Sequence, residues 1–215
     1  MDIKVVAVER EDDTQKSVYG TSGIMLDNKY VIITANVVLP LFTDYCHEDV
    51  LLFDPGAIYS SFSLKEPINL KIILNQSPEK PYYVKNGNLF AFFSSKNIKL
   101  TAQEILQEWA IDTQENSKEL ETTLSLFFVI KIIPDNNILN LKKCLIQWWN
   151  LIKNEKMNQC EEILIRSVPF GNKFFLNSYS RGIISNIVGH NSCLILSDCP
   201  SSPGSEGSPV YKIDR

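Results

Sequence analysis

The sequence contains few of the residues that most catalytic and metal sites use. It has only two histidines, His47 and His190, and its five cysteines include no C-x-x-C pair. An odd number of irregularly spaced cysteines predicts neither a zinc site nor a complete disulfide framework, and it agrees with a reducing compartment. We therefore expect no metal and no cofactor.

Long apolar runs and clusters of positive charge are also missing. The apolar stretch Leu124–Ile133 is interrupted by Lys131 and is too short to cross a bilayer. The 21 basic residues are scattered among 25 acidic ones, and the net charge of −4 gives no electrostatic footprint for nucleic acid. Residues 1–4 lack the layout of a signal peptide. We expect neither nucleic acid nor a membrane span.

Short β-rich runs separated by turn residues fill most of the sequence, which is typical of an all-β barrel or sandwich. The predicted strands are Ile3–Val8, Val18–Leu26, Tyr30–Thr34, Val50–Phe53, Leu70–Leu74, Leu89–Phe93, Thr123–Ile133, Glu162–Val168, Gly182–Val188, Cys193–Leu196 and Ser208–Lys212.

Two helices interrupt these strands. Thr101 and Glu104 resemble a capping box that would open a helix over Ala102–Ala110. A second helix is predicted over Ile138–Lys153, because four large apolar residues recur on one of its faces: Leu141, Leu145, Trp148 and Ile152. Trp148 and its neighbour Trp149 mark either a docking face or, as aromatics at helical spacing usually do, the core.

The most informative segment is P-G-S-E-G-S-P at residues 203–209, between two predicted strands. Gly204 and Gly207 allow a sharp turn whose N–H groups converge, as they do in an oxyanion hole. The segment resembles the P-G-N-S-G-G-P turn of trypsin-like proteases of the HtrA/Deg kind, with Glu206 in place of the nucleophilic serine. Glu206 is either an ordinary solvated turn residue or a built-in anion that occupies the N–H nest formed by Gly204, Ser205, Glu206 and Gly207.

A second segment, residues 20–38, resembles the first hairpin of the same fold, G-x-G-F-x-x-x-x-G-x-I-L-T-N-A-H-V-V. The dipeptide Asp27-Asn28 predicts the hairpin turn. The resemblance places Asn36 where the general base stands. An amide cannot accept a proton from a nucleophile at neutral pH, whereas imidazole can.

The third position lies in residues 126–132, which are similar to the strand D-L-A-V-L-K-V of these proteases. Leu126 replaces the acid, and leucine has no acceptor with which to orient a histidine. All three triad positions, Asn36, Leu126 and Glu206, are thus substituted. Together they predict a pseudoprotease with no catalytic residues of its own.

A narrower resemblance rests on F-F-L-N-S-Y-S-R-G-I-I-S-N (174–186), S-D-C (197–199) and P-G-S-E-G-S-P-V (203–210). These segments resemble the N-terminal half of the peroxisomal leader peptide-processing protease, the glyoxysomal processing protease of plants. The resemblance implies a serine endopeptidase that removes leader peptides from imported proteins and processes β-oxidation enzymes. It implies peroxisomal localisation, although this chain has no C-terminal S-K-L tripeptide.

The fold implied is an all-β, trypsin-like (chymotrypsin-type) double β-barrel with one or two inserted helices. We expect a first barrel over residues 1–111, a polar linker over 112–122 and a second barrel over 123–215. Because the sequence ends soon after Tyr211, the second barrel is expected to be incomplete, with an exposed strand edge. The chain would then be a fragment or a natural short isoform.

Three functions remain open. The favoured one is a non-catalytic domain that supports a catalytic C-terminal half, the expected partner, together with protein or peptide substrates that carry peroxisomal leaders; a homo-oligomer is also left open. The second is an active protease that uses Ser205 or Ser208, or Cys199, for which the sequence supplies no base. The third is a stand-alone module that binds extended peptides by β-augmentation.

Overall fold

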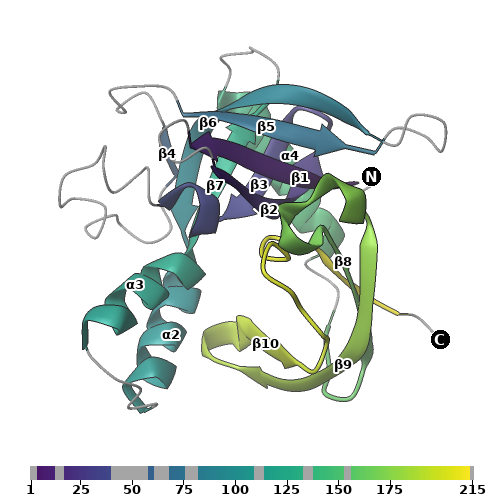
Figure 1. Cartoon of the computed structure of the whole chain (residues 1–215). Helices are drawn as coiled ribbons and strands as arrows, with labels where there is room; N and C mark the ends of the chain where they lie inside the picture. The colour runs from purple at the N-terminus through teal and green to yellow at the C-terminus, as the bar shows by residue number, and fades with distance from the viewer. Residues whose placement is uncertain are drawn as a thin grey trace.

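A computed structural model of the protein describes residues 4–12, 17–39, 58–60, 68–75, 82–108, 114–132, 138–152 and 156–213. The chain forms two lobes, each built on an antiparallel β-sheet (Figure 1). In the described residues, the first lobe contains seven strands and the second contains four. Among the described helices, none is long and apolar enough to cross a membrane.

The first lobe is a closed barrel. Its strands are β1 (Lys4–Asp12), β2 (Ser17–Leu26), β3 (Tyr30–Thr34), β5 (Asn69–Leu74), β6 (Tyr83–Ser94) and β7 (Leu126–Lys131). They follow the order β6-β5-β1-β2-β3-β7, and the pairing of β7 with β6 closes the ring. The short strand β4 (Ile58–Ser60) pairs with β6. This barrel, followed by a second antiparallel sheet, confirms the predicted all-β fold with a barrel as its first part.

The β2–β3 hairpin forms where the Asp27-Asn28 dipeptide predicts it. Both residues have positive φ angles, 51° and 55°, and the Lys29 N–H donates to the Leu26 carbonyl at 3.2 Å. Asn and Asp tolerate this left-handed conformation, which matches the twist of the flanking strands. Met25 therefore pairs with Val31, and the barrel register follows.

Several barrel strands are buried on both faces. In β1, Val6 and Val8 point into the barrel interior, whereas Val5 and Ala7 pack with Val168 of the second lobe. The sequence of a strand that is covered on both faces is a continuous apolar run, without the alternation of apolar and polar residues. The run Val5–Val8 is thus explained by the second lobe, which covers the outside of β1.

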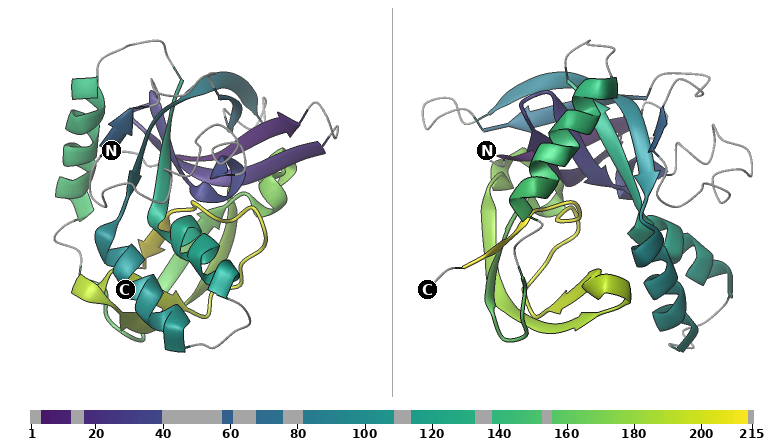
Figure 2. Two further views of the ribbon diagram at one scale, coloured as in Figure 1. Left: turned by 90° about the vertical axis from the view of Figure 1, so that its left-hand side faces the viewer. Right: turned by 180° about the vertical axis from the view of Figure 1, so that it is seen from behind.

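Helix α4 (Ile138–Ile152) covers another outer face of the barrel (Figure 2). Leu141 is buried there, and Leu145 and Trp148 pack partly buried against the same cluster, which confirms the predicted helical face. Trp149 is 60% exposed on the opposite side. Trp148 therefore packs against the core, which is one of the two roles predicted for the tryptophan pair.

Helices α2 (Lys96–Glu108) and α3 (Gln114–Ser125) form a hairpin between β6 and β7 (Figure 1). This corrects the predicted linker over 112–122 and the barrel boundary at 123. Residues 123–125 end α3, and β7 still pairs with β3 and β6, so residues 126–131 belong to the first barrel. The polar residues from Gln114 onward, which suggested a linker, are instead part of helix α3.

The start of α2 also differs from the prediction. The helix begins at Lys96, and the Ser95 hydroxyl accepts a hydrogen bond from the Ile98 N–H at 3.5 Å. Thr101 lies inside the helix and is buried, so it does not form the expected capping box. Its hydroxyl is instead engaged by the second lobe, as described below.

The second lobe contains β8 (Glu162–Ser167), β9 (Ser178–Val188), β10 (Leu194–Ser197) and β11 (Val210–Lys212), in the order β10-β9-β8-β11. Three short 3-10 turns, η4 (Pro169–Gly171), η5 (Lys173–Phe175) and η6 (His190–Ser192), connect its strands. In the described residues this sheet does not close into a ring. The predicted strand Val50–Phe53 lies outside the described residues.

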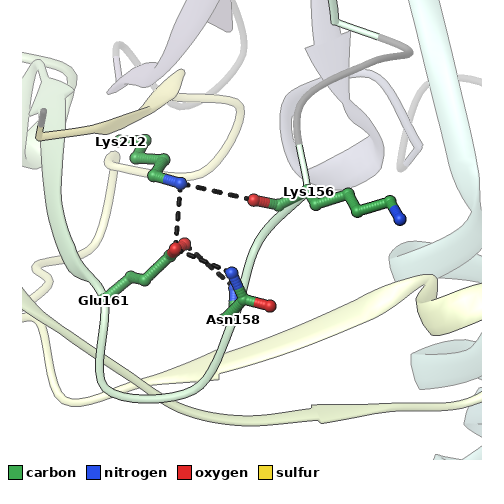
Figure 3. A network of polar contacts seen from close by, with 4 residues as sticks. All are labelled: Lys156, Asn158, Glu161 and Lys212. Atoms are coloured by element: carbon green, nitrogen blue, oxygen red, sulfur yellow. Dashed lines mark hydrogen bonds and ion pairs between the residues drawn. The ribbon is translucent and has the colours of Figure 1, made fainter.

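A polar network attaches β11 to the loop before β8 (Figure 3). Lys212 Nζ donates to the Glu161 carboxylate at 2.9 Å and to the Lys156 carbonyl at 3.4 Å. The same carboxylate accepts hydrogen bonds from the main-chain and side-chain nitrogens of Asn158, at 2.9 and 2.8 Å. The hydrogen bond from Lys212 and then those from Asn158 lower the pKa of Glu161 from 4.5 to about 2.

Candidate functional site

The Glu206 turn, residues 203–208, carries its own anion. The Gly204 N–H donates a 2.6 Å hydrogen bond to Glu206 Oε2, so the carboxylate folds back over the turn. Two further bonds hold the turn, from Ser205 N–H to the Ser202 carbonyl at 3.0 Å and from Ser208 N–H to the Ser205 carbonyl at 3.2 Å. The Gly204 N–H, which an oxyanion hole would present to substrate, is thereby already occupied.

Two hydroxyls of β2 attach this turn to the first barrel. Thr21 Oγ1 donates to the Glu206 carbonyl at 2.8 Å, and Ser22 Oγ donates to the Gly204 carbonyl at 2.7 Å. Ser22 Oγ also accepts the Val168 N–H at 2.9 Å. Ser22 is fully buried, and it therefore connects the barrel, the turn and the end of β8 through one oxygen.

Thr21 and Ser22 have no role among the sequence-based predictions. The sequence nevertheless contains a pattern that could have pointed to them. Both are polar residues in a strand whose other half, Ile24–Leu26, is apolar. Buried hydroxyls require hydrogen-bond partners, and β2 itself offers only its ladder. The partners, however, come from residues more than 140 positions away in the sequence, and no local pattern identifies them.

Three glycines bring the two lobes into backbone contact at this site. A Cβ atom on Gly20 would lie 2.7 Å from the Gly171 Cα, and a Cβ on Gly204 would collide with the Gly171 nitrogen. Gly171 and Gly204 also have positive φ angles, 59° and 87°. Only glycine fits this approach and these angles without strain, so the Gly20–Gly171–Gly204 stack fixes the distance between barrel and turn.

The turn also reaches the end of β3. A Cβ on Gly207 would lie 2.5 Å from the Ser22 carbonyl oxygen and 3.5 Å from the Thr34 nitrogen. Asn36 follows two residues after Thr34, in the 3-10 turn η1 (Ala35–Val37), where its side chain is exposed. The base-equivalent position therefore follows the strand end that the Glu206 turn contacts.

Leu126 is the first residue of β7 and is only 2% exposed. Its neighbour Phe127 pairs with Thr34, so β7 starts where β3 ends, and β7 contacts η1. The structure thus gathers the elements that carry Asn36, Leu126 and Glu206 at one end of the barrel. An exposed amide, a buried aliphatic group and a hydrogen-bonded carboxylate are not the histidine, acid and hydroxyl of a serine-protease triad.

Within the described residues, no histidine forms a hydrogen bond with the Ser208 hydroxyl, one of the alternative nucleophiles. The hydroxyl groups of Ser208 and Thr34 are both buried, and neither has a hydrogen-bond partner. His190 is engaged elsewhere: its N–H donates to Thr101 Oγ1 at 3.1 Å and its Nε2 lies 3.0 Å from Glu104 Oε1. These contacts join η6 to α2, and His47 lies outside the described residues.

The described cysteines form no reactive centre either. Cys144, Cys160, Cys193 and Cys199 are all free thiols. Burial and, second, the Asp27 carboxylate raise the pKa of Cys144, which keeps this thiol protonated. Within the described ranges, no group of three histidine, cysteine or acidic side chains could hold a metal ion.

Comparisons with known proteins return structural neighbours only. No protein-family model matches the sequence, and no curated protein matches it. The solved structures that are similar include the active form of the Rv3671c protease from M. tuberculosis, at 10% identity and a TM-score of 0.42, over 96% of this chain and 64% of that one. The protease Anisep from Arthrobacter nicotinovorans is similar at 13% identity and a TM-score of 0.42, over 99% and 78%. The chain therefore spans less than two thirds of the length of the mycobacterial protease.

Proposed function

We propose that this chain is a trypsin-like domain without peptidase activity, whose oxyanion turn is closed by the Glu206 carboxylate. The observation that carries the proposal is the 2.6 Å hydrogen bond from the Gly204 N–H to Glu206 Oε2. A tetrahedral oxyanion needs a free donor at this place, and a carboxylate that already occupies the donor also repels a second negative charge.

The residues around the turn support the same proposal. Acyl transfer requires a nucleophile, a base that takes its proton and an acid that orients the base. Glu206, Asn36 and Leu126 occupy the corresponding positions in the resemblance described above, and none of them has the required chemistry.

We also propose a role for this domain within a larger protease. We place it as the non-catalytic N-terminal part of a peroxisomal processing protease, in which it supports a catalytic C-terminal half and contributes to the recognition of leader peptides. The support is the motif resemblance of residues 174–186, 197–199 and 203–210. Peroxisomal localisation belongs to this finer proposal, as does the processing of β-oxidation enzymes.

Labelling with a fluorophosphonate probe tests the absence of activity, because the probe reacts only with an activated serine. The whole chain, its Glu206→Ser, Ser205→Ala and Ser208→Ala variants, and a known serine protease would be compared. We expect label on the protease alone, since Glu206→Ser restores an alcohol without a base. Label on the parent chain that disappears with Ser205→Ala or Ser208→Ala would overturn the proposal.

A processing assay tests the supporting role separately. The catalytic half of the protease family would be given a leader-bearing substrate with and without this chain, and cleavage would be followed by gel electrophoresis. We expect faster cleavage in the presence of the chain. Equal cleavage by the catalytic half alone would remove the supporting role while leaving the domain inactive.

A stand-alone peptide-binding module is the second candidate. The observation in its favour is that β10 and β11 each pair on one side only in the described part of the second lobe, and that Ile195 and Leu196 of β10 are exposed. Such an edge can accept an added strand. Binding of a leader peptide to the chain without any partner would favour this candidate over the supporting role.

A further inference from the structure

Four aromatic side chains are exposed in residues 170–179 of the second lobe, and the first of them, Phe170, contacts the Glu206 turn through its N–H. We call them the aromatic patch: Phe170 (62% exposed), Phe174 (78%), Phe175 (46%) and Tyr179 (61%). The rings of Phe170 and Phe175 meet edge to face, with centroids 6.2 Å apart. Exposed aromatic residues that contact one another, as Phe170 and Phe175 do, mark interaction sites more often than scattered apolar residues do.

The backbone holds the patch in an outward position at a cost in strain. Phe170 has φ 58° and ψ 16°, a left-handed conformation that costs about 1 kcal/mol for a side chain of this kind. Its N–H donates to the Pro203 carbonyl at 2.5 Å, and Gly171 follows in the glycine stack. The contact that docks the Glu206 turn therefore also turns the Phe170 ring into solvent.

Two cations order the rings further. Lys173 Nζ lies 4.7 Å from the ring centroid of Tyr82 and 5.7 Å from that of Phe174. Arg166 Cζ lies 5.9 Å from the ring centroid of Tyr179. Arg166 Nε donates a hydrogen bond to Asn177 Oδ1 at 2.9 Å. A surface whose side chains are already ordered loses less entropy when a partner binds.

The sequence segment that carries the patch has a charge opposite to that of the rest of the chain. Residues 163–197 contain three basic residues, Arg166, Lys173 and Arg181, and no aspartate or glutamate. The rest of the chain then holds 21 − 3 = 18 basic and 25 acidic residues, a net charge of −7. Arg181 is paired with Glu162, which leaves Lys173 and Arg166 beside the patch. The acidic residue Glu9 of the first barrel pairs with Gly20 across β1 and β2. It is half-buried and is already engaged in an interaction of its own.

We propose that the aromatic patch, with Lys173 and Arg166, binds a partner protein through a segment that combines carboxylates with aliphatic side chains. Aromatic residues and arginine are the side chains that dominate the energetics of protein interfaces, and the local positive charge selects an acidic segment. An anionic lipid surface fits less well, because two cations at roughly 1 kcal/mol each fall short of the clusters that membrane binding uses. The inference goes beyond the proposed function, since it concerns a surface outside the catalytic positions.

Fluorescence anisotropy with defined peptides tests this surface on the whole chain. The probes are a labelled peptide in which glutamate alternates with leucine, and the same peptide with lysine in place of glutamate. Phe174→Ser removes the most exposed ring, Lys173→Glu reverses the charge, and Trp149→Ser on α4 is the matched control, because Trp149 is similarly exposed outside the patch. Sedimentation with vesicles of phosphatidylserine and phosphatidylcholine measures the lipid alternative.

We expect the acidic peptide to bind and the lysine peptide not to bind. Phe174→Ser and Lys173→Glu should each weaken the acidic peptide by roughly tenfold or more, the effect of a central interface residue, and Trp149→Ser should leave the affinity unchanged. Absence of binding, equal binding to all variants, or vesicle binding that depends on Phe174 would overturn the proposal. Fluorophosphonate label on the chain would overturn the proposed function without affecting this one.

Discussion

The Gly204 N–H and the Glu206 carboxylate form a hydrogen bond of 2.6 Å within a single turn. The resemblance to trypsin-like proteases places this N–H in the oxyanion hole and Glu206 at the nucleophile. Under the proposed function, one glutamate therefore both replaces the alcohol and occupies the oxyanion donor.

Glu206→Ala should free the Gly204 amide. Its hydrogen exchange is expected to accelerate by roughly fivefold to tenfold, since a hydrogen bond of this kind contributes about 1 kcal/mol. Exchange measured by NMR checks this. Glu206→Gln is the matched control, because it keeps an acceptor oxygen, and equal acceleration in both variants would mean that the carboxylate does not hold the amide.

Ser22→Ala should destabilise the whole chain. The substitution leaves the Gly204 carbonyl and the Val168 N–H buried without their partner, which should lower the free energy of unfolding by about 2–4 kcal/mol. Urea denaturation measures the loss. Ser185→Ala, at an exposed position of β9, should change stability by no more than about 0.5 kcal/mol. Similar effects of both substitutions would contradict a linking role for Ser22.

Gly204→Ala should disturb the contact between the lobes. The new Cβ meets the Gly171 nitrogen, and alanine disfavours the φ of 87°, so the loss of stability should reach at least about 2–3 kcal/mol. Ser205→Ala, at the next residue, should be nearly neutral. Limited proteolysis at the junction of the lobes, followed beside denaturation, should increase in Gly204→Ala only.

Glu161 should contribute to stability in a pH-dependent way. Its pKa is about 2 in the folded chain and 4.5 ordinarily, so the folded state favours the charged form. The contribution is therefore present above pH 4.5 and is lost as the pH falls through about 2. Denaturation of the parent chain and of Glu161→Gln across this range should show a difference that shrinks toward low pH. A difference that stays constant would contradict the network of Figure 3.

Much of the first barrel follows from local sequence. The Asp27-Asn28 turn and the apolar runs on either side of it determine the β2–β3 hairpin, and the spacing of Leu141, Leu145 and Trp148 determines the buried face of α4. These patterns depend on neighbours within one element, which a sequence displays directly.

The insertion α2–α3 could not be read in the same way. Residues 112–119 are polar enough to resemble a linker, and the β-branched and apolar residues after Thr122 resemble the start of a strand. Helix α3 nevertheless continues to Ser125, because tertiary contacts with α2, such as the 3.0 Å bond from Gln103 Nε2 to Glu121, outweigh propensity.

The substituted positions were visible in the sequence, whereas their attachment was not. The contacts of Ser22, Gly20 and Gly171 join residues that are far apart in the chain, and they depend on how two lobes meet. A single glycine or serine in a sequence does not indicate which distant residue it will contact. Phe170 likewise gives no sign in the sequence that its backbone is left-handed.

The burial of Leu126 bears on the inactivity that we propose, because it would make an acid at this position difficult to restore in evolution. An aspartate at this site would bring a charge into a place that is 2% exposed, and without a histidine at position 36 that charge would have no partner. Each single reversion is therefore either useless or harmful by itself. Under the proposed function, no single reversion of this kind would therefore lead back to an active triad.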